Sequence, residues 1–267
     1  MKNKYGIITI GDPFLHMGII KSVGYDATFT HWQKNNTEAI ANHAARTGLY
    51  YQSIHAPHIK TEKMWEDCEE AKIKLDELLA CLNDCARFDI PIMVLHTFMG
   101  FEDHSPNEIG LSNFARLVDE AERLGVKLAF ENLEGEEYLA AVMERFSDSK
   151  AVGFCFDSGH QSCYNHKTDM LALYGDRLIH THLNDNLGVS GDKISAFDDL
   201  HLPIGEGIND WKNVIQKIRA TGYSDVMMAE LKLKNQPGHN ELDRFIAMPI
   251  EEFYAFSLAS LKKACEE

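Results

Sequence analysis

The sequence predicts an α/β protein of the (β/α)8 class, a TIM barrel formed by a single domain that spans residues 1–267. Eight short apolar or β-branched segments alternate with longer amphipathic segments, as strands and helices do in this class. The chain length is typical of one such barrel. Acidic and histidine side chains recur where the strand segments end. A doubly wound open sheet is the alternative, but no G-x-G-x-x-G motif follows any strand.

The N-terminal half contains four expected strands and three expected helices. Thr37 is suited to cap a helix N-terminus, and Gly48 and Gly125 are suited to end a helix. The fourth strand is apolar throughout, as expected for a strand that is covered on both faces. We expect strands at Tyr5–Ile10, Tyr25–Thr30, Tyr51–His55 and Pro91–His96, and helices at Thr37–Thr47, Thr61–Phe88 and Ser105–Leu124.

The C-terminal half continues the alternation. A long loop rich in glycine and aspartate follows the seventh strand, and loops of this length are usually functional. We expect strands at Val126–Glu131, Val152–Asp157, Leu178–His182 and Asp225–Glu230, and helices at Glu136–Phe146, Lys167–Tyr174, Asn209–Ala220 and Ile250–Cys265.

The composition favours a soluble protein that acts on small molecules. Apolar residues make up 45% of the chain, and the net charge is −15. This charge repels polyphosphate, and the basic segment typical of DNA-binding proteins is missing from the sequence. The N-terminus does not resemble a signal peptide, and no apolar run reaches the roughly 18 residues of a membrane helix. We therefore expect a cytoplasmic protein without a nucleic-acid or membrane partner.

The six cysteines show no C-x-x-C spacing and are too sparse for a disulfide framework. We expect reduced thiols, as is usual in the cytosol. Cys155 lies in an apolar strand and is expected in the core.

Side chains that can bind a metal follow most of the predicted strands. In this fold class the carboxyl ends of the strands converge on one mouth, where the active site lies. Taken singly, each histidine is more simply a structural residue, and each carboxylate can cap the next helix. Together they predict a metal site, because each ends an apolar strand with a group that needs a partner. The residues are His55, His96, Glu131, Asp157, His160, His182, Asp199, His201 and Glu230.

Within this set, Glu131, Asp157, His182 and Glu230 are the expected metal ligands, and the other five residues are candidate outer ligands. His58 is an alternative to His55 as the inward-facing group. We place His180 on the opposite face of its strand from His182, as a packing residue or as a residue that supports the ligands. The remaining histidines are expected on the solvated surface: His16, His31, His43, His104, His166 and His239.

Four residues are candidates for substrate contact: His160, His58, Asn184 and Trp211. Asn184 lies in the polar segment that ends the seventh strand, whereas Trp32, Trp65 and Trp211 are more simply core residues. Gly205-Glu206-Gly207 precedes a helix and could bind a phosphate through its backbone N–H groups. A tight turn that requires glycine is the favoured explanation. Whether the substrate is phosphorylated stays open.

These motifs resemble those of the xylose-isomerase-like TIM-barrel superfamily, which includes sugar and sugar-phosphate isomerases, epimerases and endonuclease IV. They are fairly specific for the superfamily and much less specific for a reaction. They extend from the third to the eighth strand and read S-I-H-A-P-H, V-L-H-T, A-F-E-N-L-E-G, C-F-D-S-G-H, H-T-H-L-N-D-N, D-L-H-L-P-I-G-E-G and M-A-E-L-K.

The resemblance implies two alternative metal sites. Ketose epimerases and related isomerases hold one ion with four residues, which match Glu131, Asp157, His182 and Glu230 here. Endonuclease IV adds ligands for two more zinc ions, which match His55, His96, His160, Asp199 and His201. Many epimerases have arginine at the position of His201, so the sequence departs from them there. It also departs from endonuclease IV, because G-D-P-F-L-H replaces its G-x-H-V-S segment and an Arg-rich segment after the second strand is missing.

We therefore expect a metal-dependent isomerase or epimerase of a small sugar or sugar-derived carbonyl compound. Glu131 and Glu230 would move a proton, and the ion (Mn, Zn, Co or Mg) would stabilise the enediolate. Two alternatives stay open: a multinuclear zinc phosphoesterase similar to endonuclease IV, and a lyase or dehydratase that uses the same enolate chemistry. The substrate, the number of ions and the presence of a homo-oligomer are not determined by the sequence.

Overall fold

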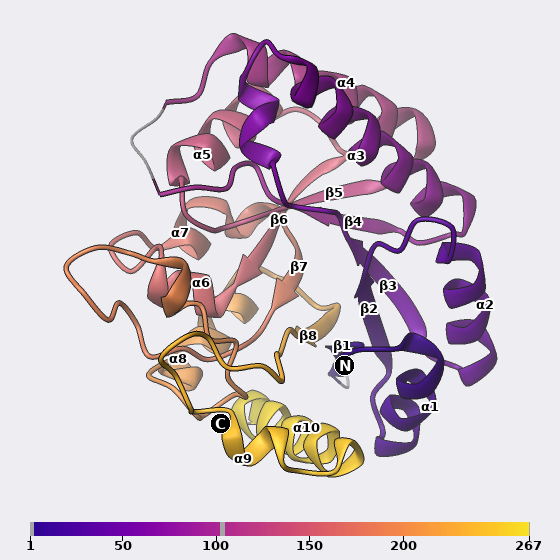
Figure 1. The fold of residues 1–267 in the computed structure, drawn as a ribbon, viewed down its shortest axis with the longest axis vertical. Coiled ribbons are helices and arrows are strands. Elements are labelled where there is room, and N and C mark those ends of the chain that lie inside the picture. Colours follow the sequence, from indigo (N-terminus) through magenta and orange to yellow (C-terminus); the bar gives the residue numbers. More distant parts are fainter. Residues whose placement is uncertain (1–2, 102–104, 267) are drawn as a thin grey trace.

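The strands form a nearly closed parallel barrel. A computed structural model describes residues 3–101 and 105–266. The strands follow the order β7-β6-β5-β4-β3-β2-β1-β8, and a bridge between Leu183 and Ala229 brings β7 to β8 (Figure 1). The bounds are β1 Lys4–Ile8, β2 Ala27–His31, β3 Tyr50–His55, β4 Ile92–Leu95, β5 Lys127–Glu131, β6 Val152–Asp157, β7 Leu178–His182 and β8 Val226–Ala229. The predicted fold class is confirmed.

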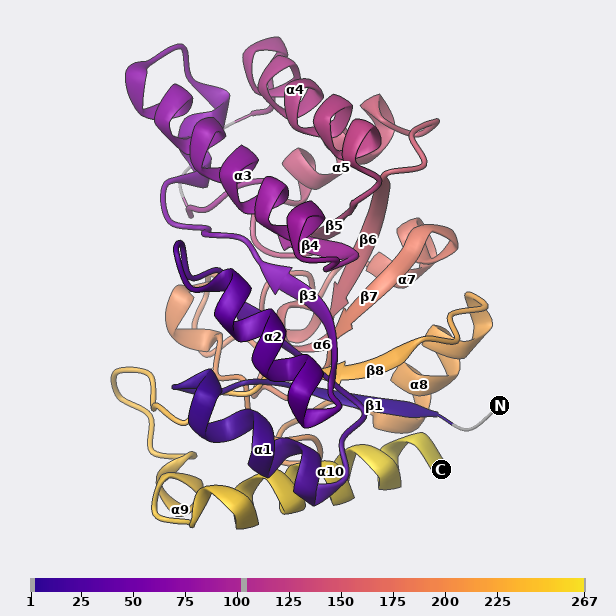
Figure 2. The same ribbon diagram turned by 90° about the vertical axis from the view of Figure 1, so that its right-hand side faces the viewer.

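Helices surround the barrel, with α10 packed beside α1 below β1 in the side view (Figure 2). None of the helices in the described part of the chain has the length and apolar character needed to cross a bilayer. The α-helices are α1 Pro13–Val23, α2 Thr37–Thr47, α3 Glu69–Arg87, α4 Glu108–Leu124, α5 Glu136–Arg145, α6 Ser158–Cys163, α7 Met170–Tyr174, α8 Trp211–Ala220, α9 Asp243–Ile246 and α10 Ile250–Glu266. The 3-10 helices are η1 Thr61–Trp65, η2 Gly175–Arg177 and η3 Ala196–Asp198.

Three α-helices were not predicted: α1, α6 and the four-residue α9. The sequence contains clear signals for the first of them. The Asp12 side chain accepts a hydrogen bond from the Phe14 N–H, Pro13 occupies the first turn, and Gly24 ends α1 in the left-handed region with φ of 111°. These are ordinary start and stop signals of a helix. Helix α6 has only six residues and begins directly after Asp157, which caps it.

The predicted helix Thr61–Phe88 is wrong in one respect, because an extended segment at Glu66 and Cys68 divides it into η1 and α3. The contacts of Trp65 hold the chain in this non-helical arrangement. Its indole N–H donates to the Thr97 carbonyl over 2.8 Å, and its ring is buried against α4. A continuous helix would not leave Trp65 in this position.

The barrel interior is apolar near the base and polar towards the mouth. Ile92, Val94, Ala129 and Cys155 form a small inner cluster, so the prediction that Cys155 is a core residue is confirmed. All six cysteines are free thiols.

The placement of His180 was wrong. Its Nε2 lies 3.1 Å from the Ser53 hydroxyl in the interior, and its ring lies 5.2 Å from that of His182. Residues two apart in a strand share a face, so His180 points inward like His182.

Replacement of a helical glycine by alanine should have opposite effects on stability at Gly110 and at Gly18. A Cβ at Gly110 would lie 1.9 Å from a ring carbon of Trp65, whereas a Cβ at Gly18 would meet nothing within 4 Å. We expect Gly110→Ala to lower the free energy of unfolding by roughly 1–3 kcal/mol through overpacking. Gly18→Ala should raise it by about 0.5–1 kcal/mol through helix propensity. Urea unfolding measures both, and an equal change in the two variants would contradict the packing at Trp65.

Candidate metal centre

The nine predicted metal-binding residues lie together at the carboxyl ends of the strands. Strands β3, β5, β6 and β7 end in His55, Glu131, Asp157 and His182. His160 lies in α6, directly after β6, and the loops after β4, β7 and β8 contribute His96, Asp199, His201 and Glu230. In the described part of the chain, the side-chain atoms available for a metal form four groups, three of which contain Glu131. One of these, Glu131 with Cys155 and His182, overlaps the first of the three clusters described below.

The first cluster consists of Glu131, Asp157, His182 and Glu230, whose candidate ligand atoms all lie within 4.8 Å of one another. His182 Nδ1 is 3.0 Å from Glu131 Oε1 and 3.2 Å from Glu230 Oε2. All four residues are buried. Three carboxylates and one imidazole form a mixed N/O set suited to a divalent ion.

The second cluster consists of His55, His96 and Glu131. Nε2 of His55 and Nε2 of His96 lie 3.3 and 3.4 Å from Glu131 Oε2. The two oxygens of Glu131 therefore face different clusters, Oε1 the first and Oε2 the second. His55 Nδ1 lies 2.8 Å from the Ala56 carbonyl. A carbonyl can only accept, so Nδ1 carries the proton and Nε2 presents a lone pair to the cluster.

The third cluster consists of His160, Asp199 and His201. Nε2 of His160 lies 3.6 Å from Asp199 Oδ1, and Nε2 of His201 lies 2.9 Å from Asp199 Oδ2. The Nδ1 atoms of the two rings face the backbone carbonyls of Asn132 and Glu230. Lys232 also reaches this cluster, with Nζ 2.8 Å from Asp199 Oδ2.

Several buried polar atoms of these clusters have no hydrogen-bond partner among the described residues. They include Glu131 Oε2, Asp199 Oδ1 and His96 Nδ1. A buried carboxylate oxygen without a partner costs substantial free energy. A cation beside Glu131 would remove this cost at the first two clusters, so the residues present there fit a divalent metal.

The pKa shifts at the mouth reflect the crowding of charges. Burial, together with the neighbouring carboxylates Glu131 and Glu230, raises the pKa of Asp157 to about 6. Burial acts to raise the pKa of Glu131 as well, but the surrounding imidazoles hold it well below its usual range. His58, which is half-buried, has its pKa lowered to about 3 by burial and by neighbouring histidines.

Asn132 and Asn184 hold Asp157 in place. The Asn132 amide donates to the Asp157 carbonyl over 2.9 Å and accepts from the Asp157 N–H over 2.8 Å. The Asn184 amide donates to Asp157 Oδ2 over 2.9 Å, and the His160 N–H donates to Oδ1 over 2.7 Å. These bonds fix the direction of the carboxylate before any ligand binds.

The residues expected to contact substrate fall into two groups. His58 and His160 line a mouth cavity of about 540 Å³, together with Glu131 and Glu230. Asn184 and Trp211 are not among the described residues that line it. Asn184 instead supports Asp157, and the Trp211 indole donates to Asp185 Oδ2 over 2.8 Å.

The Gly205-Glu206-Gly207 segment forms a turn around the Asp185 carboxylate. The Gly205 N–H donates to Asp185 Oδ2 over 3.0 Å, and Gly205 has φ of 86°. A Cβ at Gly207 would lie 2.3 Å from the Asn186 carbonyl oxygen. The carboxylate takes the place that a phosphate would need, so the geometry agrees with the tight-turn explanation.

Some residues at the mouth were not predicted. His31 is exposed, as expected, but it ends β2 with its ring 5.1 Å from that of His55. Its position at a strand end was the available signal. Tyr164 stacks on His160 with ring centroids 5.1 Å apart, and Lys232 enters from the loop after β8. Nothing in the local sequence pattern indicates these two contacts. His104 lies outside the described residues.

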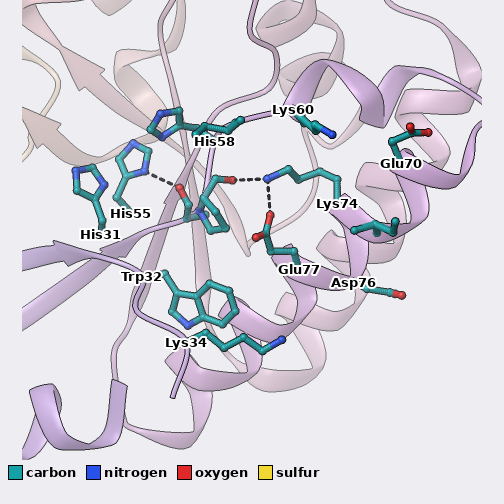
Figure 3. A pocket seen from close by; sticks show the side chains of 14 residues that line it. His31, Trp32, Lys34, His55, His58, Lys60, Glu70, Lys74, Asp76 and Glu77 are labelled. Carbon is teal, nitrogen blue, oxygen red and sulfur yellow. Dashed lines mark hydrogen bonds and ion pairs between the residues drawn. The ribbon is translucent and has the colours of Figure 1, made fainter. Parts of the chain in front are cut away.

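A second cavity of about 780 Å³ adjoins the mouth (Figure 3). His31, His55 and His58 line both cavities. The indole of Trp32 forms part of its wall, and the buried Lys74 ammonium contacts the Pro57 carbonyl over 3.0 Å and Glu77 over 2.6 Å. The three shared histidines therefore place this cavity directly beside the mouth cavity, on the side of α3.

The chain matches a family model described as a xylose isomerase-like TIM barrel over residues 18–263. An uncharacterized protein of Methanocaldococcus jannaschii is 27% identical over 195 residues, which cover 67% of this chain and 64% of that protein. An uncharacterized protein of Sinorhizobium fredii is 32% identical over 140 residues, which cover 49% of this chain and 42% of that protein. The chain thus matches less than two thirds of the length of these curated relatives.

Several solved structures share the fold. D-psicose 3-epimerase of Clostridium cellulolyticum H10 has a TM-score of 0.76 at 13% identity, with 98% of this chain and 99% of that chain covered. A 3-keto-D-glucoside 4-epimerase from E. coli has a TM-score of 0.71 at 18% identity, with 98% and 100% covered. A xylose isomerase-like TIM barrel/4-hydroxyphenylpyruvate dioxygenase fusion protein has a TM-score of 0.77 at 15% identity, with 99% and 43% covered. At these identities the likeness concerns the fold alone.

The support of Asp157 by Asn132 can be tested through stability. Asn132→Ala leaves the buried N–H and carbonyl of Asp157 without their partners. We expect the free energy of unfolding to fall by at least about 2 kcal/mol, because each unsatisfied buried group is costly. Urea unfolding measures the change. Asn36→Ala is the control, since Asn36 is exposed and its side chain makes no helix-capping bond; equal stability of the two variants would contradict the role of Asn132.

Proposed function

Because the chain belongs to the xylose isomerase-like TIM-barrel family, we propose that it is a divalent-metal-dependent isomerase or epimerase of a small sugar or sugar-derived carbonyl compound. The observation that carries this proposal is the first cluster, in which two glutamates from different strands approach one imidazole at the mouth. The similar structures named as sugar epimerases are consistent with it.

The proposed ligands are Glu131, Asp157, His182 and Glu230. Their N/O donor set suits Mn, Zn, Co or Mg. A divalent ion held there would polarise a carbonyl and the adjacent hydroxyl and would stabilise an enediolate after proton loss. The rigid support of Asp157 by Asn132 and Asn184 would keep the ligand geometry fixed.

Glu131 and Glu230 are the proposed proton-transfer groups. Burial acts to raise the pKa of both carboxyls, but nearby histidines hold it well below the usual range. Both are therefore ionised at neutral pH and able to accept a proton from carbon. If each glutamate serves one face of the carbon, the product is an epimer. If one glutamate moves the proton between adjacent carbons, the product is the isomeric aldose or ketose.

His58 and His160 are proposed to orient the substrate from the wall of the mouth cavity. The lowered pKa of His58 keeps its ring neutral at pH 7. A neutral imidazole can both donate and accept, which suits a sugar hydroxyl. Burial of the first cluster limits access of water to the reacting carbon.

Proton transfer predicts exchange with solvent. In D2O, the metal-loaded protein should replace the hydrogen next to the carbonyl of at least one ketose, and proton NMR follows this exchange across D-fructose, D-tagatose, D-psicose and L-ribulose. Glu230→Gln should slow exchange by roughly 10²–10⁴-fold, because the base is lost at nearly constant volume. Glu252→Gln, at an exposed position on α10, should have no effect. Absence of exchange for all four sugars, or full activity of Glu230→Gln, would contradict the proposal.

A multinuclear zinc hydrolase of a small phosphoester is the second candidate. The specific observation in its favour is that Glu131 directs its second oxygen to His55 and His96. A carboxylate that bridges two ions is not free to accept a proton from carbon, whereas adjoining ions suit phosphoester hydrolysis. The net charge of −15 disfavours duplex DNA as the substrate.

The two candidates predict different metal contents. The proposed isomerase site holds one ion per chain, and His96→Ala should leave that number unchanged. A multinuclear hydrolase needs an ion at the second cluster, so His96→Ala should remove one equivalent. Elemental analysis after dialysis against Zn²⁺ or Mn²⁺ gives the number. His239→Ala is the control, because His239 contacts Glu241 away from the mouth. A second equivalent in the wild type that His96→Ala removes would favour the hydrolase.

A further inference from the structure

A positively charged side chain, Lys232, forms an ion pair with the third cluster. We infer that the ammonium of Lys232 takes the place of a metal ion at His160, Asp199 and His201, so that the wild-type protein binds no ion there. This inference rests on the proposed function for the presence of metal at the other clusters. It limits the number of ions that the site can hold.

The contacts of Asp199 place the Lys232 ammonium where an ion of the third cluster would lie. Its Oδ2 lies 2.8 Å from Lys232 Nζ and 2.9 Å from His201 Nε2. An ion held by this cluster would bind the same carboxylate, because Asp199 is one of its three members. An ion bound there would lie within a few ångströms of the ammonium. Two positive charges at such a separation repel, although the partial exposure of the Lys232 side chain to water weakens the repulsion.

The backbone places Lys232 over this cluster. The Lys232 N–H contacts the His201 carbonyl at 3.4 Å, so the loop after β8 is joined to the loop that contains His201. The Lys232 side chain lines the mouth cavity next to Asp199. Lys234 lines the same cavity, but the ion pairs at Asp199 are with Lys232 and the two histidines.

The sum of the formal charges at the three clusters also disfavours a third ion. The four carboxylates of the three clusters, Glu131, Asp157, Asp199 and Glu230, give −4. Lys232 reduces this sum to −3. One ion leaves −1, two ions give +1 and three ions give +3, which is costly in a buried site. Without Lys232, a third ion would leave only +2.

Removal of the ammonium should open the third cluster to a metal. The Nδ1 atoms of His160 and His201 face backbone carbonyls, so both Nε2 atoms point towards Asp199 and could bind an ion once they have lost their protons. Lys232→Met keeps the length of the side chain and removes its charge. We expect it to bind one more ion per chain than the wild type. Lys232→Arg retains the charge and should bind the wild-type number.

Elemental analysis of the full-length protein, saturated with Zn²⁺ and then gel-filtered, measures the number of ions. Replacement with Co²⁺ gives a second readout, since an additional His₂Asp site adds visible absorption in Lys232→Met. Lys234→Met is the matched control and should resemble the wild type. Equal metal contents in wild type and Lys232→Met would overturn the inference. A wild type that binds no metal would instead contradict the proposed function, which separates the two failures.

Discussion

The burial of three carboxylates within reach of one imidazole is the constraint on which the mouth of this barrel depends. Glu131, Asp157 and Glu230 converge on His182 where water is largely excluded. Like charges at this spacing repel, and burial adds a further cost to each. The raised pKa of Asp157, at about 6, is the direct consequence of burial and of its two acidic neighbours. A cation offsets both costs, and we propose that a divalent metal supplies it.

The fold supplies this arrangement through parallel strands that end at one edge. Strands β3, β5, β6 and β7 each end in one side chain of the site, and neighbouring segments supply the bonds that orient it, as Asn132 and Asn184 do for Asp157. Glu131 is the member on which the chemistry depends, because its two oxygens face separate clusters. In the proposed one-ion site it would be free to act as a base. A second ion beside His96 would make it a shared ligand, which would favour hydrolysis over proton transfer.

Much of the site could be predicted from sequence, because a residue that ends a barrel strand has its position fixed by the fold. His55, Glu131, Asp157 and His182 all follow this rule. Contacts made by loop residues could not be predicted in this way. The ion pair of Lys232 with Asp199 joins the loops after β8 and β7, and the hydrogen bond of Trp211 to Asp185 removes that indole from the substrate side. Helix α1 was missed although Asp12, Pro13 and Gly24 mark its ends, and His180 was misplaced by an error of strand periodicity.

The central claim is that one ion binds where Glu131, Asp157, His182 and Glu230 meet. Anomalous diffraction from crystals grown with Mn²⁺ or Zn²⁺, recorded at the absorption edge of the metal, locates such an ion without reference to activity. The account predicts a peak at about 2.0–2.2 Å from ligand atoms of all four residues. Side chains that stay in the present arrangement with no anomalous peak between them, at millimolar metal, would contradict it.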